Sequence, residues 1–141
     1  MDTPCVRSLT IMGKDFAGAG RVSTEIKSLL KELGIPPSTI RRVAIAAYEA
    51  EMNVVMYAEE ATMGLQVTAE SIGIVVADRG PGIPDIEAAM REGFSTATSE
   101  MREMGFGAGM GLPNMKRNSD TFTITSAVGR GTTVRMSFAV S

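Results

Sequence analysis

Hydrophobic residues recur along the chain at two spacings, and these spacings mark its helices and strands. Apolar positions three or four residues apart predict helices over about 22–33 and 39–58, with Asp15 and Ser38 as the respective N-cap candidates. Continuous or alternating apolar runs of shorter length predict strands. The almost uninterrupted apolar run over 72–78 is typical of a central strand that is covered on both faces.

Turn-forming residues separate the remaining elements. The stretch over 92–104 has little apolar periodicity, and we interpret it as a mobile lid. The other predicted elements are strands over 5–11, 63–69, 121–126 and 132–140, a hairpin turn at 70–71, a loop over 79–84, a short helix over 85–91, and a helix that opens with the glycine-rich run 105–111 and ends near 119.

The order of these elements, β-α-α-β-β-α-β-β, contains no internal repeat and no linker. With 141 residues the chain has the length of one ordinary domain. We therefore expect residues 1–141 to form a single α+β domain, a two-layer sandwich in which helices cover one face of a mixed, mostly antiparallel sheet. The other face would be solvated or would pair with a partner. A homodimer is also compatible with the sequence alone.

Composition and charge exclude several classes of function. The chain is 44% hydrophobic and 21% charged, has no apolar run long enough to span a bilayer and lacks the features of an export signal, so we expect a cytoplasmic protein that does not bind membranes. A net charge of −2 argues against nucleic-acid binding. The chain has no histidine, which excludes Ser-His-Asp catalysis, the usual zinc sites and histidine autophosphorylation. Acid–base chemistry must therefore use carboxylates.

Glu49 and Asn53 form the first candidate site. Four residues on a helix correspond to about 400° of rotation and roughly 6 Å of rise, so both side chains project from one stripe. A carboxylate and an amide in this arrangement could hold a hydrated magnesium ion and orient an attacking hydroxyl, although such a pair is also common on a solvated helix face. Glu51 lies about 200° from Glu49, and we interpret it as a surface charge.

The second candidate site is the segment DRGPG over 78–82, which begins where the apolar run ends. The carboxylate of Asp78 could accept a hydrogen bond from an exocyclic amine such as adenine N6. Gly80 and Gly82 would let the backbone turn beneath a flat ring. A plain turn is the alternative interpretation of this segment.

Two glycine-rich segments complete the set of candidates. In GFGAGMGL, over 105–112, alternate glycines would let backbone N–H groups approach phosphate oxygens at a helix N-terminus, with a merely flexible loop as the alternative. This run fits neither the dinucleotide-binding fingerprint nor the P-loop, so those two folds are disfavoured. In GRGTT, over 129–133, a hairpin turn carries a threonine hydroxyl that could reach Asp78 directly or through water.

Taken in this order, the four motifs resemble the N, G1, G2 and final boxes of the GHKL (Bergerat-fold) ATPase superfamily, over residues from about 38 to 140. Within that superfamily the chain looks most like the bacterial anti-sigma-factor serine kinases and switch kinases, which the segments GPGIPDI over 80–86 and EGFST over 92–96 resemble. The resemblance implies a Bergerat fold, binding of ATP or ADP with Mg²⁺, and transfer of the γ-phosphate to a serine or threonine of a STAS-type antagonist.

The resemblance also implies roles for individual residues. Asn53 would coordinate magnesium, Glu49 would act as general base and Asp78 would bind adenine. A lid over 94–104 would close on the triphosphate, with Arg102 either at the γ-phosphate or in solvent. The expected nucleotide-binding residues are Asn53, Asp78, Gly80, Gly82, Ile83, Gly105, Gly107, Gly109, Met110, Gly111, Leu112 and Thr132, with Ser95, Thr96 and Arg102 in the lid.

More than one class of function fits these motifs. The first is a magnesium-dependent protein serine/threonine kinase, and the second is a binding module in which ATP or ADP sets the affinity for a sigma factor or output enzyme. A histidine-kinase fragment acting in trans is a third, weakened because the chain has no phosphoacceptor histidine. Retention of both Glu49 and Asn53 favours the kinase, although the first two classes need the same pocket.

Overall fold

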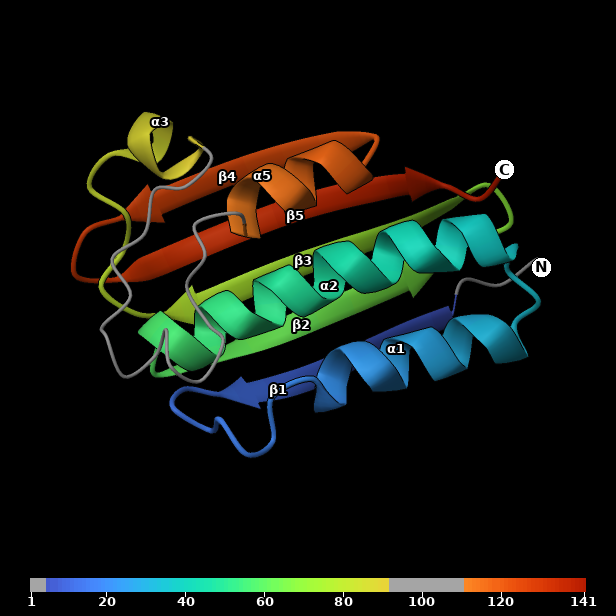
Figure 1. The fold of residues 1–141 in the computed structure, drawn as a ribbon, viewed down its shortest axis with the longest axis horizontal. Helices are drawn as coiled ribbons and strands as arrows, with labels where there is room; N and C mark the ends of the chain where they lie inside the picture. The colour runs from blue at the N-terminus through green and yellow to red at the C-terminus, as the bar shows by residue number, and fades with distance from the viewer. Residues whose placement is uncertain (1–4, 92–110) are drawn as a thin grey trace.

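The structure is a computed structural model in which residues 5–91 and 111–141 are described (Figure 1). Its strands form one five-stranded sheet with the order β1-β2-β3-β5-β4, and all four neighbouring pairs are antiparallel. The elements are β1 (Cys5–Met12), α1 (Arg21–Glu32), α2 (Pro37–Tyr57), β2 (Glu60–Val67), β3 (Ser71–Arg79), α3 (Ile86–Ala89), α5 (Gly111–Asn118), β4 (Thr121–Ala127) and β5 (Gly131–Ala139).

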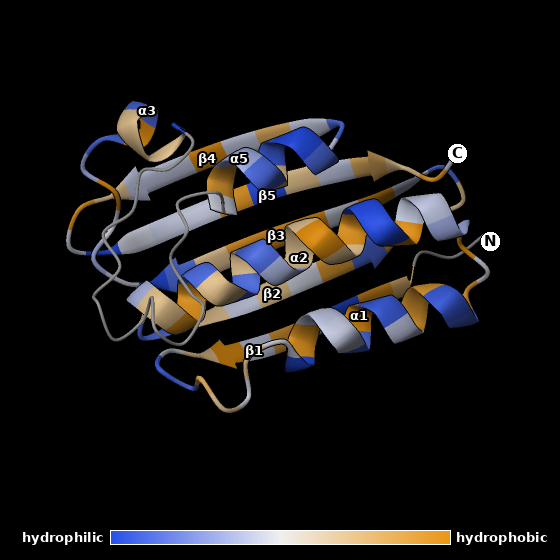
Figure 2. Ribbon diagram, in the orientation of Figure 1, coloured by the Kyte–Doolittle hydropathy of each residue, from blue (hydrophilic) through white to orange (hydrophobic). Residues whose placement is uncertain are grey.

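Helices α1, α2 and α5 cover one face of the sheet (Figure 1). Hydrophobic and hydrophilic positions alternate along the strands, as Figure 2 shows. On β2, for example, Met63 and Leu65 are buried whereas Thr62 and Gln66 are exposed, because successive side chains of a strand point to opposite faces. The predicted α+β sandwich with helices on one face is confirmed, but the described strands pair only in the antiparallel sense and do not form the mixed sheet that was expected.

The opposite face of the sheet carries no helix within the described residues. On the central strand β3, Val75 is half-buried and Ala77 is exposed on this face. The expectation that this strand is covered on both faces is therefore wrong. Its apolar run arises because a glycine, a valine and an alanine, rather than larger polar residues, occupy the outward positions.

Helix α2 starts with prolines rather than with the predicted serine cap. Pro36 is the N-cap and Pro37 the first helical residue, so Ser38 lies within the first turn. Proline suits the first helical position because the N–H that it lacks would have no carbonyl partner in the helix. Although α2 is 21 residues long, neither it nor any other helix within 5–91 and 111–141 is apolar enough to cross a membrane.

The N-terminus of α1 is capped by a side chain of α2. Asp15, the predicted cap, instead accepts a hydrogen bond within the turn before the helix. The Glu51 carboxylate accepts hydrogen bonds from the backbone N–H groups of Gly20 and Val22, at 3.1 Å each, and of Ser23, at 2.8 Å. Glu51 is only 2% exposed, so its interpretation as a surface charge is wrong. The first N–H groups of a helix lack intrahelical partners and attract a carboxylate.

The β2–β3 hairpin turns one residue earlier than predicted. The strand register leaves Ala69 and Glu70 as the turn residues, instead of Glu70 and Ser71. The hydroxyl of Thr68 accepts hydrogen bonds from the backbone N–H groups of Glu70 and Ser71, at 3.3 and 3.0 Å. A threonine that bonds the backbone just ahead of it in this way fixes the turn at that point.

Candidate functional site

Two polar side chains of α2 meet the first residue of α5. Glu49 and Asn53 lie one helical turn apart. A Cβ atom on Gly111 would lie 3.2 Å from Asn53 Oδ1 and 3.5 Å from Glu49 Oε2. Glycine therefore lets the start of α5 come close to both polar groups. The structure thus brings the predicted α2 pair and the end of the glycine-rich run together.

The Glu49 carboxyl is half-buried. Desolvation raises its pKa above the ordinary value of 4.5, and a hydrogen bond with the Asn114 side chain opposes this shift without cancelling it. Asn114 follows Gly111 by three residues in α5, so both lie on the side of that helix that faces Glu49. Asn114 lies outside the predicted motifs, although its spacing from Gly111 was a signal that could have found it.

Asp78 lies near the end of β3, and its Oδ1 atom accepts a hydrogen bond from the backbone N–H of Thr132 at 3.0 Å. Burial raises the pKa of this carboxyl above 3.8, and the hydrogen bond acts in the opposite direction. The Thr132 hydroxyl instead forms a hydrogen bond with the Ser126 hydroxyl at 2.9 Å. Thr132 therefore contacts Asp78 as predicted, but through its backbone N–H and not through its hydroxyl. Within the described residues, Oδ2 of Asp78 has no hydrogen-bond partner.

The loop after β3 is hydrogen-bonded to the β4–β5 hairpin beside Asp78. The backbone N–H of Gly80 donates to the carbonyl oxygen of Arg130 at 3.1 Å, and that of Ile83 donates to the Ser126 hydroxyl at 2.7 Å. Gly82 has φ of 75°, and a Cβ atom there would lie 2.4 Å from a carbonyl oxygen of β4. These bonds place the predicted base-binding loop against the turn that contacts Asp78.

Replacing Gly131 with alanine is expected to destabilise the protein. A Cβ atom at this position would lie 2.0 Å from the carbonyl oxygen of Asp78, and the residue has φ of 153°. We expect the free energy of unfolding to fall by about 2–3 kcal/mol, measured by urea denaturation. Gly73→Ala is the matched control, because a Cβ atom there meets nothing within 4 Å. Equal losses for the two variants would contradict the steric argument.

Both parts of the site lie at the same end of the sheet. Figure 1 shows the end of α2, the end of β3 and the turn between β4 and β5 together at this end. A Cβ atom on Gly80 would lie 3.1 Å from the Cα atom of Ala58, the C-cap residue that follows α2. Asn53 precedes Ala58 by little more than one helical turn. The Asp78 carboxylate and the α2 pair therefore border one region.

One further predicted site residue is buried, and several have no structural description. Leu112 is 7% exposed and belongs to the hydrophobic core beneath α5. The predicted lid over 94–104 and part of the glycine-rich run fall outside the described residues, which leaves the following predicted positions without a structural description: Ser95, Thr96, Arg102, Gly105, Gly107, Gly109 and Met110.

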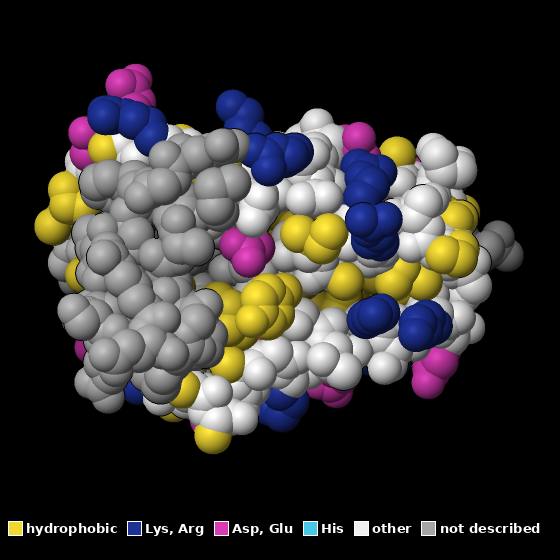
Figure 3. Space-filling view, in the orientation of Figure 1, with side chains coloured by type: hydrophobic (Ala, Val, Ile, Leu, Met, Phe, Trp, Pro, Cys, Tyr) yellow, Lys and Arg dark blue, Asp and Glu magenta, His cyan; other side chains and the backbone are white. Residues whose placement is uncertain are grey.

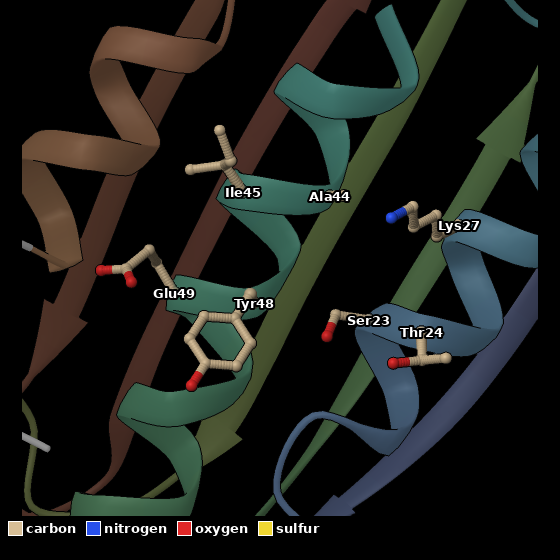
Figure 4. Close-up of a pocket in the computed structure, with 7 residues that line it drawn as sticks. All are labelled: Ser23, Thr24, Lys27, Ala44, Ile45, Tyr48 and Glu49. Atoms are coloured by element: carbon tan, nitrogen blue, oxygen red, sulfur yellow. The ribbon is translucent and has the colours of Figure 1, made fainter. Parts of the chain in front are cut away.

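A surface groove of about 400 Å³ lies over α1 and α2 (Figure 4). This volume falls in the range of ligand-binding sites in proteins. Among the described residues that line it, Glu49 alone belongs to the predicted site, because the others look like ordinary helix surface in the sequence. The groove is lined by Ser23, Thr24, Lys27, Ala44, Ile45, Tyr48 and Glu49.

Comparison with known proteins finds relatives along most of the chain. Residues 15–138 match the histidine kinase-like ATPase domain family. The serine/threonine-protein kinase RsbT of Bacillus subtilis (strain 168) is 33% identical over 138 residues, which cover 95% of this chain and 94% of that protein. Anti-sigma F factors of Thermoanaerobacter sp. (strain X514) and Caldanaerobacter subterraneus subsp. tengcongensis are each 32% identical over 118 residues, covering 80% of this chain and 79% of each relative.

Proposed function

Because the chain belongs to the family of histidine kinase-like ATPase domains, we propose that it is a cytoplasmic regulatory kinase that uses Mg·ATP to phosphorylate a serine or threonine of a STAS-type antagonist protein. Residues 1–141 would act as one ATP-binding domain. The names of the relatives support this assignment, since one is a serine/threonine-protein kinase and others are anti-sigma factors. The structural observation that supports the assignment is the close approach of Gly111, at the start of α5, to the side chains of Glu49 and Asn53.

The Asp78 carboxylate fits an adenine base. Thr132 N–H occupies Oδ1, which leaves Oδ2 to accept a hydrogen bond from an exocyclic amine. The loop with Gly80, Gly82 and Ile83 would lie against the ring, because glycines let the backbone approach closely. The half-buried setting of the carboxylate strengthens such a hydrogen bond relative to one in water.

Replacing Asp78 with asparagine should weaken ATP binding. The Thr132 N–H requires an oxygen at Oδ1, so the new amide would turn its NH₂ group toward the adenine amine and set donor against donor. We expect a loss of about 1–3 kcal/mol, or roughly five- to 150-fold in Kd, by isothermal titration calorimetry. Asp85→Asn is the control, because Asp85 is the N-cap of α3 and asparagine caps equally well. Unchanged affinity of the Asp78 variant would refute the adenine assignment.

Oxygen atoms near the start of α5 fit magnesium and phosphate. Asn53 Oδ1 and Glu49 Oε2 are the kind of hard ligands that Mg²⁺ prefers, and Mg²⁺ commonly keeps several waters and binds few protein groups. In line with this, no cluster of three or more acidic, cysteine or histidine residues forms a metal site within the described ranges. Asn53 would hold the ion, and backbone N–H groups at the start of α5 would face the phosphates.

Glu49 would act as the general base. Its carboxylate would take the proton of the acceptor hydroxyl as the hydroxyl oxygen bonds the γ-phosphorus and the bond to ADP breaks. The raised pKa makes it a stronger base than an exposed glutamate. Asn114 would hold the carboxylate in place through its side-chain hydrogen bond. When bound, Mg·ATP supplies the phosphoryl group and the metal charge that neutralises it.

The alternative is a nucleotide-gated binding module, and the anti-sigma F factor relatives favour it as the second candidate. In this case ATP or ADP would set the affinity for a sigma factor or output enzyme, with little phosphotransfer. Adenine and magnesium would be bound as in the kinase. The two candidates differ only in whether Glu49 acts chemically.

Incubation of the purified chain with γ-labelled ATP, Mg²⁺ and each STAS-domain protein of the same genome tests the kinase assignment. Label on a serine or threonine of one of these proteins is the expected result. Binding of such a protein without label would favour the binding module. Neither binding nor label with any of them would overturn the proposed partner class.

A further inference from the structure

The groove over α1 and α2 presents apolar side chains next to Glu49. Ile45 and Tyr48 keep 36% and 44% of their surface exposed. Figure 4 shows the Tyr48 ring on α2 between Glu49 on one side and α1 on the other. Large hydrophobic side chains that border a groove of about 400 Å³ are typical of a surface that binds another molecule.

The α1 side of the groove is basic. Lys27 lines the groove, and Lys31 is exposed one turn further along the same side of α1. Glu25 and Glu32 lie about 160° and 140° around the helix from Lys27, away from the groove. No salt bridge involves either lysine among residues 5–91 and 111–141. Figure 3 shows lysine and arginine side chains beside hydrophobic ones on this face. The groove therefore favours an apolar segment that carries an acidic residue.

Glu49 joins the groove to the candidate nucleotide site. It lines the groove, and it also lies against Gly111 at the start of α5. The other candidate nucleotide residues, Asn53 and Asp78, lie toward the C-terminal end of α2, whereas the groove extends from Glu49 toward α1. The groove therefore offers a protein a route to Glu49 that leaves Asn53 and Asp78 uncovered.

We propose that this groove is the docking site for the phosphoacceptor protein. A segment beside the phosphorylated residue would place an apolar side chain against Ile45 and Tyr48 and an acidic side chain next to Lys27. This inference rests on the proposed function, because it assigns the substrate-binding surface of the same site. The apolar contacts contribute affinity and the lysine contributes specificity and association rate.

The test compares three groove variants with a control on the uncovered sheet face. Lys27→Glu and Tyr48→Ala should raise the Kd for the STAS-domain protein that the wild-type chain binds by about tenfold or more, measured by calorimetry, while Mg·ATP affinity stays within about twofold. Lys27→Arg should retain binding because it keeps the charge. Arg135→Glu is the matched charge reversal, since Arg135 is exposed on β5 and lies on the other side of the sheet.

Phosphotransfer separates docking from catalysis. If docking alone is lost, Lys27→Glu should raise KM for the STAS-domain protein by a similar factor and leave kcat within about threefold. A Kd unchanged from wild type in both Lys27→Glu and Tyr48→Ala, with an active wild-type chain, would overturn the groove assignment only. A wild-type chain that neither binds nor phosphorylates a STAS-domain protein would overturn the proposed partner and the groove assignment together.

Discussion

Replacing Glu51 with alanine is expected to lower the free energy of unfolding by about 3–5 kcal/mol. The carboxylate accepts three backbone hydrogen bonds at the start of α1, from Gly20, Val22 and Ser23. Val22 is fully buried and Ser23 is 6% exposed, so water cannot readily replace the lost acceptor. Unpaired buried N–H groups carry the full cost of desolvation. Urea denaturation followed by circular dichroism measures the effect.

Two further variants calibrate the effect of Glu51→Ala. Glu51→Gln keeps the shape of the side chain but only one acceptor oxygen, so we expect an intermediate loss of stability. Glu25→Ala removes an exposed carboxylate from α1 and should change stability by less than about 0.5 kcal/mol. If Glu51→Ala and Glu25→Ala destabilise equally, the capping role of Glu51 is wrong.

Replacing Glu49 with glutamine should lower the rate of phosphotransfer by about 10²- to 10⁴-fold while leaving the affinity for Mg·ATP nearly unchanged. Glutamine preserves the size of the side chain but cannot take a proton from the acceptor hydroxyl. Single-turnover measurements with labelled ATP and the phosphoacceptor protein give the rate, and calorimetry gives the nucleotide affinity. Glu25→Gln, an exposed site on α1, is the control and should transfer phosphate at the wild-type rate.

The pH dependence of phosphotransfer gives an independent check on Glu49. A general base works in its deprotonated form, so the wild-type rate should rise with pH through a midpoint above 4.5, because desolvation raises this pKa. The glutamine variant should lack this rise. A variant that transfers phosphate as fast as wild type would exclude Glu49 as the base. A variant that regulates the partner as well as wild type, without transfer, would favour the binding module.

Local geometry was predictable from the sequence because helix periodicity fixes the spacing of neighbouring side chains. The i, i+4 relation of Glu49 and Asn53 predicted that they share a stripe of α2, and the structure places both near Gly111. The same reasoning correctly placed Glu51 on a different side of α2 from Glu49, but it did not predict that Glu51 is buried. Rotation about one helix says nothing about the neighbour on that side, and here the neighbour is the start of α1.

Contacts between distant segments were harder to predict. The strands containing Asp78 and Thr132 were both predicted, but β3 pairs with β5, and this register places Ala77 opposite Thr133. That pairing brings the Thr132 N–H rather than its hydroxyl to Asp78. The groove was not predictable for a similar reason, because it exists only where α1 lies beside α2. Its α1 side, which includes Lys27, looks like solvated helix surface in the sequence.

The position of Glu51 has a mechanical consequence for α2. Glu51 holds the first turn of α1, whereas Glu49 and Asn53, on another side of the same helix, border α5. Turning α2 about its long axis to withdraw Asn53 from Gly111 would pull Glu51 away from the amides that it caps. The orientation of Glu49 and Asn53 therefore depends on an intact first turn of α1, which resists rotation of α2 about its long axis.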